Sequence, residues 1–196
     1  MSGTGYKDVY WIGGSFSGGK STTARLLTEK LGITLYHYDR HLLTDPAFAA
    51  FKVRDGEWFW LPIDEKFSRY KQTFPVAMNQ LRQCAESGPV ITEGPGWLPE
   101  LLASVPINPE RVTYLLPTPK FQRWANRQRG QWVDDVLAAK PDPQSAWEKW
   151  MRNDQQFADF LAASAVIHGF RAIRVDGTLS PEGVAQMVAG HFRLNV

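Results

Sequence analysis

The chain has 196 residues, 43% of them hydrophobic and 21% charged, which predicts one globular domain, 1–196, and excludes an intrinsically disordered protein. The formal net charge of +2 gives no electrostatic basis for binding nucleic acid or a membrane surface. One cysteine, Cys84, excludes an internal disulfide framework, and no apolar run resembles a signal peptide or a membrane span, so we expect a cytoplasmic protein.

The first predicted elements enclose a glycine-rich loop. The apolar run Val9–Ile12 is typical of a strand, and Ser21–Leu31 is typical of a helix. Between them, Gly14–Ser21 matches the phosphate-loop pattern G-x-x-x-x-G-K-[ST], in which backbone N–H groups and the helix N-terminus bind phosphate. We expect ATP or GTP here, with Lys20 reaching the β- and γ-phosphates and the Ser21 hydroxyl ligating Mg²⁺. The nucleotide-binding residues predicted in this loop are Gly14, Ser15, Phe16, Ser17, Gly18, Gly19, Lys20, Ser21 and Thr22.

The second predicted strand, Ile33–Tyr38, is followed by Asp39 and Arg40. Ligands of parallel α/β sheets bind beyond the carboxyl ends of the strands, so Asp39 would lie across from the phosphate loop. A carboxylate there can accept or orient the proton of an attacking hydroxyl, although Asp39 could also be a helix cap or a turn residue. Asp39 and Arg40 are candidate acceptor-binding residues, and Arg40 could equally point to solvent.

The segment of about 41–88 follows, and it is rich in aromatic residues. Its later part, Asp64–Glu86, predicts a helix that is kinked or split at Pro75. Aromatic side chains usually belong to a core, but in an acceptor pocket they would favour a ring-shaped substrate. We expect this segment to be a substrate-binding insert.

The third predicted strand, Val90–Thr92, is followed by Glu93 and Gly94. Phosphate-loop proteins usually carry an acidic residue at this place, which makes Glu93 a candidate for the magnesium shell or for the acceptor. Gly94 would permit close approach of the backbone to a ligand. An ordinary carboxylate at a strand end is the alternative reading of Glu93.

The fourth predicted strand, Val112–Leu116, leads into a helix that carries Lys120, Arg123 and Arg127 on one face. Such a face is often only solvated. Alternatively, the region of about 118–145 is a lid that brings Arg123 and Arg127 onto the transferring phosphate, a role that suits the planar guanidinium.

The fifth predicted strand, Ala172–Val175, is followed by Asp176, Gly177 and Thr178, which could pass beside a nucleotide base or form a plain tight turn. Ser180 then caps a terminal helix. Strands that alternate with helices predict an α/β fold with three layers, α/β/α, around a five-stranded, mostly parallel sheet.

With these elements in order, the chain resembles the P-loop small-molecule and nucleoside or nucleotide kinases, which include adenylate, shikimate, gluconate and uridine kinases. The resemblance implies a P-loop fold of the nucleotide-kinase type. It also implies that Asp39 engages the acceptor hydroxyl, that Arg123 and Arg127 form the lid, and that the loop after the fifth strand lines the base. The residues that carry the resemblance are Gly14–Ser21, Tyr38–Arg40, Ile91–Gly94, Arg123, Arg127 and Val175–Thr178.

The resemblance does not name the substrate. The loop ends in Lys20-Ser21, unlike the Lys-Gly of adenylate kinases, and the chain has no Asn-Lys-x-Asp motif, which argues against a guanine-selective GTPase. We expect an ATP- and Mg²⁺-dependent kinase for a nucleoside, nucleotide, sugar or small acid, acting as a monomer or homodimer without nucleic-acid or membrane partners. The alternatives are a nucleotide-dependent switch or binding protein and an antibiotic-modifying phosphotransferase.

Overall fold

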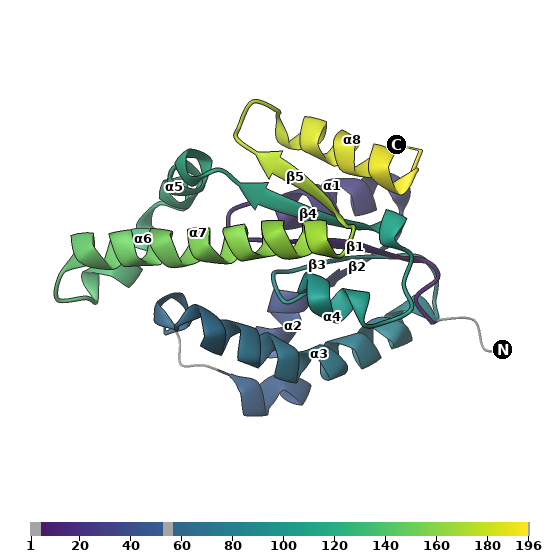
Figure 1. Ribbon diagram of the computed structural model, residues 1–196, viewed down its shortest axis with the longest axis horizontal. Helices are drawn as coiled ribbons and strands as arrows, with labels where there is room; N and C mark the ends of the chain where they lie inside the picture. The colour runs from purple at the N-terminus through teal and green to yellow at the C-terminus, as the bar shows by residue number, and fades with distance from the viewer. Residues whose placement is uncertain (1–4, 53–56, 196) are drawn as a thin grey trace.

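A five-stranded parallel sheet forms the centre of the molecule (Figure 1). The structure is a computed structural model that describes residues 5–52 and 57–195; residues 53–56, part of the predicted insert, lie outside the described residues. The strand order is β2-β3-β1-β4-β5, and every pairing is parallel. All five predicted strands are present: β1 Val9–Gly14, β2 Thr34–His37, β3 Val90–Glu93, β4 Val112–Pro117 and β5 Arg171–Val175.

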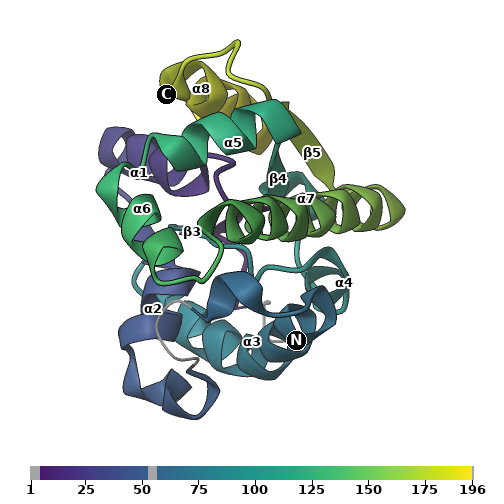
Figure 2. The same ribbon diagram turned by 90° about the vertical axis from the view of Figure 1, so that its left-hand side faces the viewer.

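Helices cover both faces of this sheet (Figures 1 and 2). One face is covered by α1, Lys20–Leu31, and α8, Pro181–Phe192. The other is covered by α3, Ile63–Ala85, α4, Pro99–Ala103, and α7, Pro143–Ile167. The predicted three-layer α/β/α architecture is therefore confirmed.

Each face of the sheet has its own apolar core, and β1 contributes to both. Successive strand residues point to opposite faces, so Trp11 packs with Trp97 beneath α3, α4 and α7, while Ile12 packs with Leu27 of α1. All four side chains are almost completely buried. Burial on both faces explains why the central strands are continuous apolar runs without polar alternation.

Two local predictions, one for α3 and one for α8, can be compared with the structure. The helix runs through Pro75 without interruption, so the predicted split does not occur. Ser180 caps α8 as predicted, because its hydroxyl accepts a hydrogen bond from the Gly183 N–H.

Across 5–52 and 57–195, no helix combines the length and apolar character that crossing a lipid bilayer requires. The smaller elements are α2 Tyr38–Thr44, η1 Pro46–Phe51, η2 Trp58–Trp60, η3 Pro109–Arg111, α5 Pro119–Arg127 and α6 Gln131–Ala138.

The carboxyl ends of the strands meet at one edge of the sheet. Glu93 at the end of β3 is in register with Ile12 of β1 and with His37 at the end of β2. On the other side of β1, Gly14 is in register with Leu115 of β4. This pairing brings the loops after β1, β2 and β3 together, at the edge where ligands of parallel sheets bind.

Candidate active site

The loop between β1 and α1 has the backbone geometry of an anion site. Gly14 has a φ of 133°, and a Cβ at this position would collide with the carbonyl oxygen of Leu115. Helix α1 begins at Lys20 after Gly19, whose φ is 82°, and no side chain caps its N-terminus. The first N–H groups of α1 are therefore open to a ligand, and the helix dipole adds positive potential there.

Lys20 lies over this loop. Its side chain is largely buried, and its Nζ donates a hydrogen bond to the Ser15 carbonyl oxygen at 2.8 Å. Burial lowers the pKa of Lys20, while the carboxylates of Glu93 and Asp39 oppose this effect. The ammonium group is thus held beside the loop, with two carboxylates close enough to influence it.

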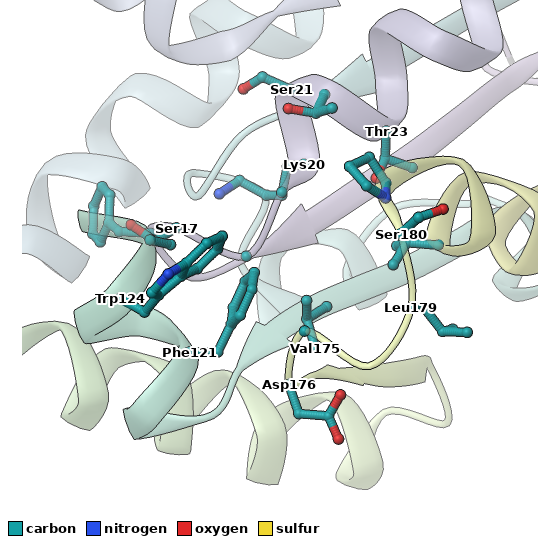
Figure 3. A pocket seen from close by; sticks show the side chains of 18 of the residues that line it. Ser17, Lys20, Ser21, Thr23, Phe121, Trp124, Val175, Asp176, Leu179 and Ser180 are labelled. Atoms are coloured by element: carbon teal, nitrogen blue, oxygen red, sulfur yellow. The ribbon is translucent and has the colours of Figure 1, made fainter. Parts of the chain in front are cut away.

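A cavity of about 830 Å³ is lined by the phosphate loop, by Asp39 and by the loop after β5. Figure 3 shows Lys20 of the phosphate loop and Asp176 of the loop after β5 around this cavity. A volume of this size suits a nucleotide, since ligand pockets are typically about 300–1,000 Å³. Gly14, Ser15 and Thr178 do not line it. The predicted nucleotide-binding residues that do are Phe16, Ser17, Gly18, Gly19, Lys20, Ser21, Thr22, Asp176 and Gly177.

Glu93 connects the phosphate loop with β2. Its buried carboxylate accepts a hydrogen bond from the Ser21 hydroxyl at 3.1 Å and one from His37 Nδ1 at 2.7 Å. The hydrogen bond to Glu93 raises the pKa of His37. Sequence reasoning did not find His37, which is recognisable only once the register of β2 and β3 is known.

The pair of Ser21 and Glu93 fits the chemistry of magnesium. Mg²⁺ prefers oxygen ligands and usually takes one or two carboxylates together with water and substrate phosphates. In the described part of the chain, no cluster of three or more His, Cys, Asp or Glu side chains could hold a metal ion by itself. Phosphate oxygens would therefore have to complete the coordination around Ser21 and Glu93.

Asp39 is another carboxylate that lines the cavity. It lies in the first turn of α2, which packs closely against the end of β3: a Cβ on Gly94 would lie 2.5 Å from Tyr38 Cβ. Burial, and then the charge of Glu93, raise the pKa of Asp39 to about 7, against the opposing effects of Lys20 and His37. Gly94 thus contributes by allowing α2 to approach.

The two arginines expected in a lid point away from the cavity. Arg123 forms a bidentate pair with Glu148 of α7, at 3.0 and 2.7 Å. The Arg127 guanidinium stacks on the Trp147 ring at 4.0 Å from its centroid. Neither arginine lines the cavity, so the expectation that they face the phosphate loop is wrong for this structure. Arg40, expected near the acceptor, is exposed and does not line the cavity either.

Arg129 is the arginine that reaches the phosphate loop. It lines the cavity, and its Nη2 donates to the Ser17 hydroxyl at 3.4 Å. On a helical wheel extended from Pro119, Arg129 lies off the face that carries Arg123 and Arg127. However, α5 ends at Arg127 and the chain turns at Gly130. The wheel therefore does not apply to Arg129, because the turn sets the direction of its side chain.

Two aromatic residues of α5 form the opposite wall of the cavity. Figure 3 shows the rings of Phe121 and Trp124 between α5 and the phosphate loop. Their centroids are 5.3 Å apart, and Trp124 is 57% exposed. The Asp176 carboxylate beyond them accepts hydrogen bonds at Oδ1 from the N–H and the hydroxyl of Thr178, which fix its orientation. Phe121 and Trp124 lie at helical spacing in the sequence, but such spacing alone does not distinguish a core from a ligand pocket.

No protein-family model matches the sequence, and no curated protein matches it. Solved structures do resemble the fold. A deoxyadenosine kinase from M. mycoides with bound dATP superposes with a TM-score of 0.54 at 15% identity, over 95% of this chain and 99% of that chain. The same kinase with dCMP and a flexible dCDP gives 0.52 at 16% identity, over 94% and 98%. An uncharacterized protein from Eubacterium ventriosum gives 0.50 at 17% identity, over 95% and 98%. At these identities the likeness shows the fold alone, and it agrees with the α/β fold that the sequence predicts.

Proposed function

We propose that the protein is an ATP- and Mg²⁺-dependent kinase that transfers the γ-phosphoryl group to a hydroxyl or phosphate oxygen of a small molecule. One observation carries the proposal: a single cavity joins an anion-binding loop, an aromatic wall and the carboxylate of Asp39. A nucleoside triphosphate needs the anion-binding loop and the aromatic wall, and an acceptor hydroxyl needs the carboxylate.

The nucleotide would bind with its phosphates at the N-terminus of α1 and its base against α5. The N–H groups of α1 and the ammonium of Lys20 would bind the phosphate oxygens. Phe121 and Trp124 offer the base an apolar, ring-shaped surface, and bases stack on aromatic rings without strong sequence preference. Arg129 is placed to neutralise charge on the transferring phosphoryl group, a role in which the region of about 118–145 would act as the lid.

Asp39 would act on the acceptor. A carboxylate with a pKa of about 7 is ionised in a substantial fraction of molecules at neutral pH and still basic enough to take a proton. The acceptor oxygen would form a bond to the γ-phosphorus as the bond to the β-phosphate oxygen breaks, and Asp39 would receive the hydroxyl proton. Mg²⁺, held by Ser21 and Glu93 together with the phosphates, would supply charge neutralisation.

A nucleotide-dependent switch is the second candidate, and the region of about 41–88 discriminates against it. A switch would present an exposed apolar patch to a partner. In the described residues of that region, 41–52 and 57–88, the only exposed large apolar side chain is Leu43, which is 66% exposed. A single exposed leucine is normal for a protein surface, so this observation favours the kinase.

Two variants test the proposal. Lys20→Ala should abolish turnover in a coupled assay of ADP release, whereas Asp39→Asn should keep Mg·ATP binding in isothermal titration and lose phosphoryl transfer. The two variants should differ because Lys20 lies at the phosphate loop, whereas Asp39 lies at the proposed acceptor end of the cavity. Unchanged turnover in Asp39→Asn would remove the role proposed for this carboxylate.

A further inference from the structure

A buried pair of opposite charges lies next to the phosphate loop and takes no part in the function proposed above. Lys66 comes from α3 and Asp154 from α7, two helices that pack against one another on the same face of the sheet (Figures 1 and 2). Lys66 is 1% exposed and Asp154 is completely buried. Charged side chains are rarely this deeply buried without partners.

Each member of the pair has a polar atom without a hydrogen-bond partner. Asp154 Oδ2 accepts a hydrogen bond from Trp150 Nε1 at 3.0 Å, but Asp154 Oδ1 accepts none from the described residues. Lys66 Nζ likewise has no partner among them, and its nearest ring is that of Phe16, at 5.6 Å from the centroid. The two charged groups do not form a direct ion pair with each other. Burying such groups unsatisfied is costly, because each loses its hydrogen bonds to water.

The pair is connected to the loop that would bind the nucleotide. The Ser15 hydroxyl donates to the backbone carbonyl of Asp154 at 3.1 Å, and the ring of Phe16 packs against Phe157 of α7 at 5.6 Å. Phe16 also lines the 830 Å³ cavity. Phe16 therefore both lines the cavity and lies next to Lys66.

Tyr70 relates the pair to Asp39. Tyr70, one turn along α3 from Lys66, is buried, and burial raises its pKa well above the usual value. The carboxylates of Asp39 and Asp154 both add to this effect, so Tyr70 is close to both. The geometry agrees, since the ring of Tyr70 lies 6.0 Å from the ring of Tyr38, the residue before Asp39.

We propose that Lys66 and Asp154 bind an uncharged polar edge of the acceptor, which accepts a hydrogen bond from Lys66 Nζ and donates one to Asp154 Oδ1. This inference rests on the kinase activity proposed above. It assigns the acceptor to the class of molecules that carry an uncharged edge with a hydrogen-bond donor beside a hydrogen-bond acceptor, such as the amide edge of a heterocycle or a pair of hydroxyl groups. The rings of Phe16 and Tyr70 favour a flat heterocycle over a polyol.

The charges around the pair support a neutral ligand. Asp154 is the carboxylate that acts on Lys66, and Lys66 is the cation that acts most strongly on Asp154, with smaller effects from Arg129 and Lys20. Burial lowers the pKa of Lys66 and raises that of Asp154 to about 6. An anionic group between the two would be repelled by Asp154, and a cationic group by Lys66. A neutral edge satisfies both atoms. Neither Lys66 nor Asp154 lines the cavity, so a ligand reaches them only if Phe16, which does line it, moves aside.

Matched acceptor pairs test the inference with the full-length wild-type protein. ADP release would be measured with adenosine and purine riboside, cytidine and pyrimidin-2-one riboside, and glucose and 2-deoxyglucose, pairs in which the second member lacks one hydrogen-bond donor. The member that keeps the donor should have at least about a tenfold higher kcat/KM in the preferred pair, because the other member leaves the buried Asp154 Oδ1 without a partner. Equal kcat/KM values within the preferred pair would overturn the inference and leave the kinase activity standing. If no compound stimulates ADP release although Mg·ATP binds, the proposed kinase activity fails.

Variants then connect the preference to the pair. Lys66→Met and Asp154→Asn should each raise the KM for the preferred acceptor about tenfold or more, and leave the KM for ATP within about twofold. Lys140→Met is the matched control, because Lys140 stacks on the Trp60 ring outside the cavity and its loss should change neither constant.

A double variant, Lys66→Met with Asp154→Leu, guards against unfolding of the single variants, since it leaves no unpaired charge. The preferred acceptor should raise the thermal midpoint of the wild type and not that of the double variant. An unchanged acceptor KM in the folded variants would show that the pair is structural, for example bridged by an internal water, and would overturn the inference.

Discussion

Replacing Asp39 by Asn should make the protein more stable at alkaline pH. The pKa of Asp39 is raised from 3.8 to about 7 in the folded protein, chiefly by burial and then by Glu93. The folded protein therefore binds more protons than the unfolded chain between these two values, and the wild type loses stability as the pH rises through that window. Each pKa unit corresponds to about 1.4 kcal/mol, so the full loss is at most roughly 4 kcal/mol.

Urea unfolding at about pH 5 and about pH 8 measures this effect. Asparagine has nearly the same shape and no charge, so Asp39→Asn should exceed the wild type in free energy of unfolding, and its advantage should grow by about 2–3 kcal/mol between the two pH values. Asp135→Asn, a control on the exposed face of α6, should change stability little at either pH. If Asp39→Asn is less stable than the wild type at about pH 8, or if the difference does not depend on pH, our account of this carboxylate is wrong.

The same variant should lose activity, which would separate function from stability. Proton acceptance by Asp39 requires its ionised form, so the kcat/KM of the wild type should fall as the pH decreases below about 7. The residual activity of Asp39→Asn should not show this limb. Buried carboxylates at active sites often reduce stability in this way.

Three further predictions concern the walls of the cavity and the fold. Trp124→Ala should weaken Mg·ATP binding by roughly 5- to 150-fold, the range for loss of one base stack, and should remove the ATP-induced change in tryptophan fluorescence; Trp132→Ala, which does not line the cavity, should do neither. Arg129→Met should lower kcat by a factor on the order of 10², whereas Arg123→Met should lower it by less than about twofold because its ion pair with Glu148 faces away from the cavity; equal losses would contradict this assignment. Ser180→Ala removes the cap of α8 and should cost about 1 kcal/mol in urea unfolding.

The parts of the site that sequence could predict are local. The phosphate loop is eight consecutive residues between a strand and a helix, and its conformation follows from its own glycines and from the start of α1. Asp39 and Glu93 were found because both follow strands, and all parallel strands end at the same edge of the sheet. The five strands were visible in the sequence and alternate with helices, and this alternation was sufficient to predict the three-layer fold.

The parts that sequence could not predict depend on where helices end and on long-range packing. Arg129 was missed because its direction is set by the turn after α5, whereas Arg123 and Arg127 were assigned from a periodicity that holds only inside the helix. Lys66 and Asp154 belong to helices far apart in the chain, and each looks like an ordinary charged helix residue until α3 and α7 are packed together. Local patterns contain no information on that contact.

The transfer of label from [γ-³²P]ATP tests the central claim most directly. With Mg²⁺ and a mixture of nucleosides, sugars and small acids, we predict that the wild-type protein moves the label onto an organic acceptor, and that Lys20→Ala does not. Label that stays in ATP, or that appears only as inorganic phosphate, would contradict the claim that this cavity joins a nucleotide site to an acceptor site.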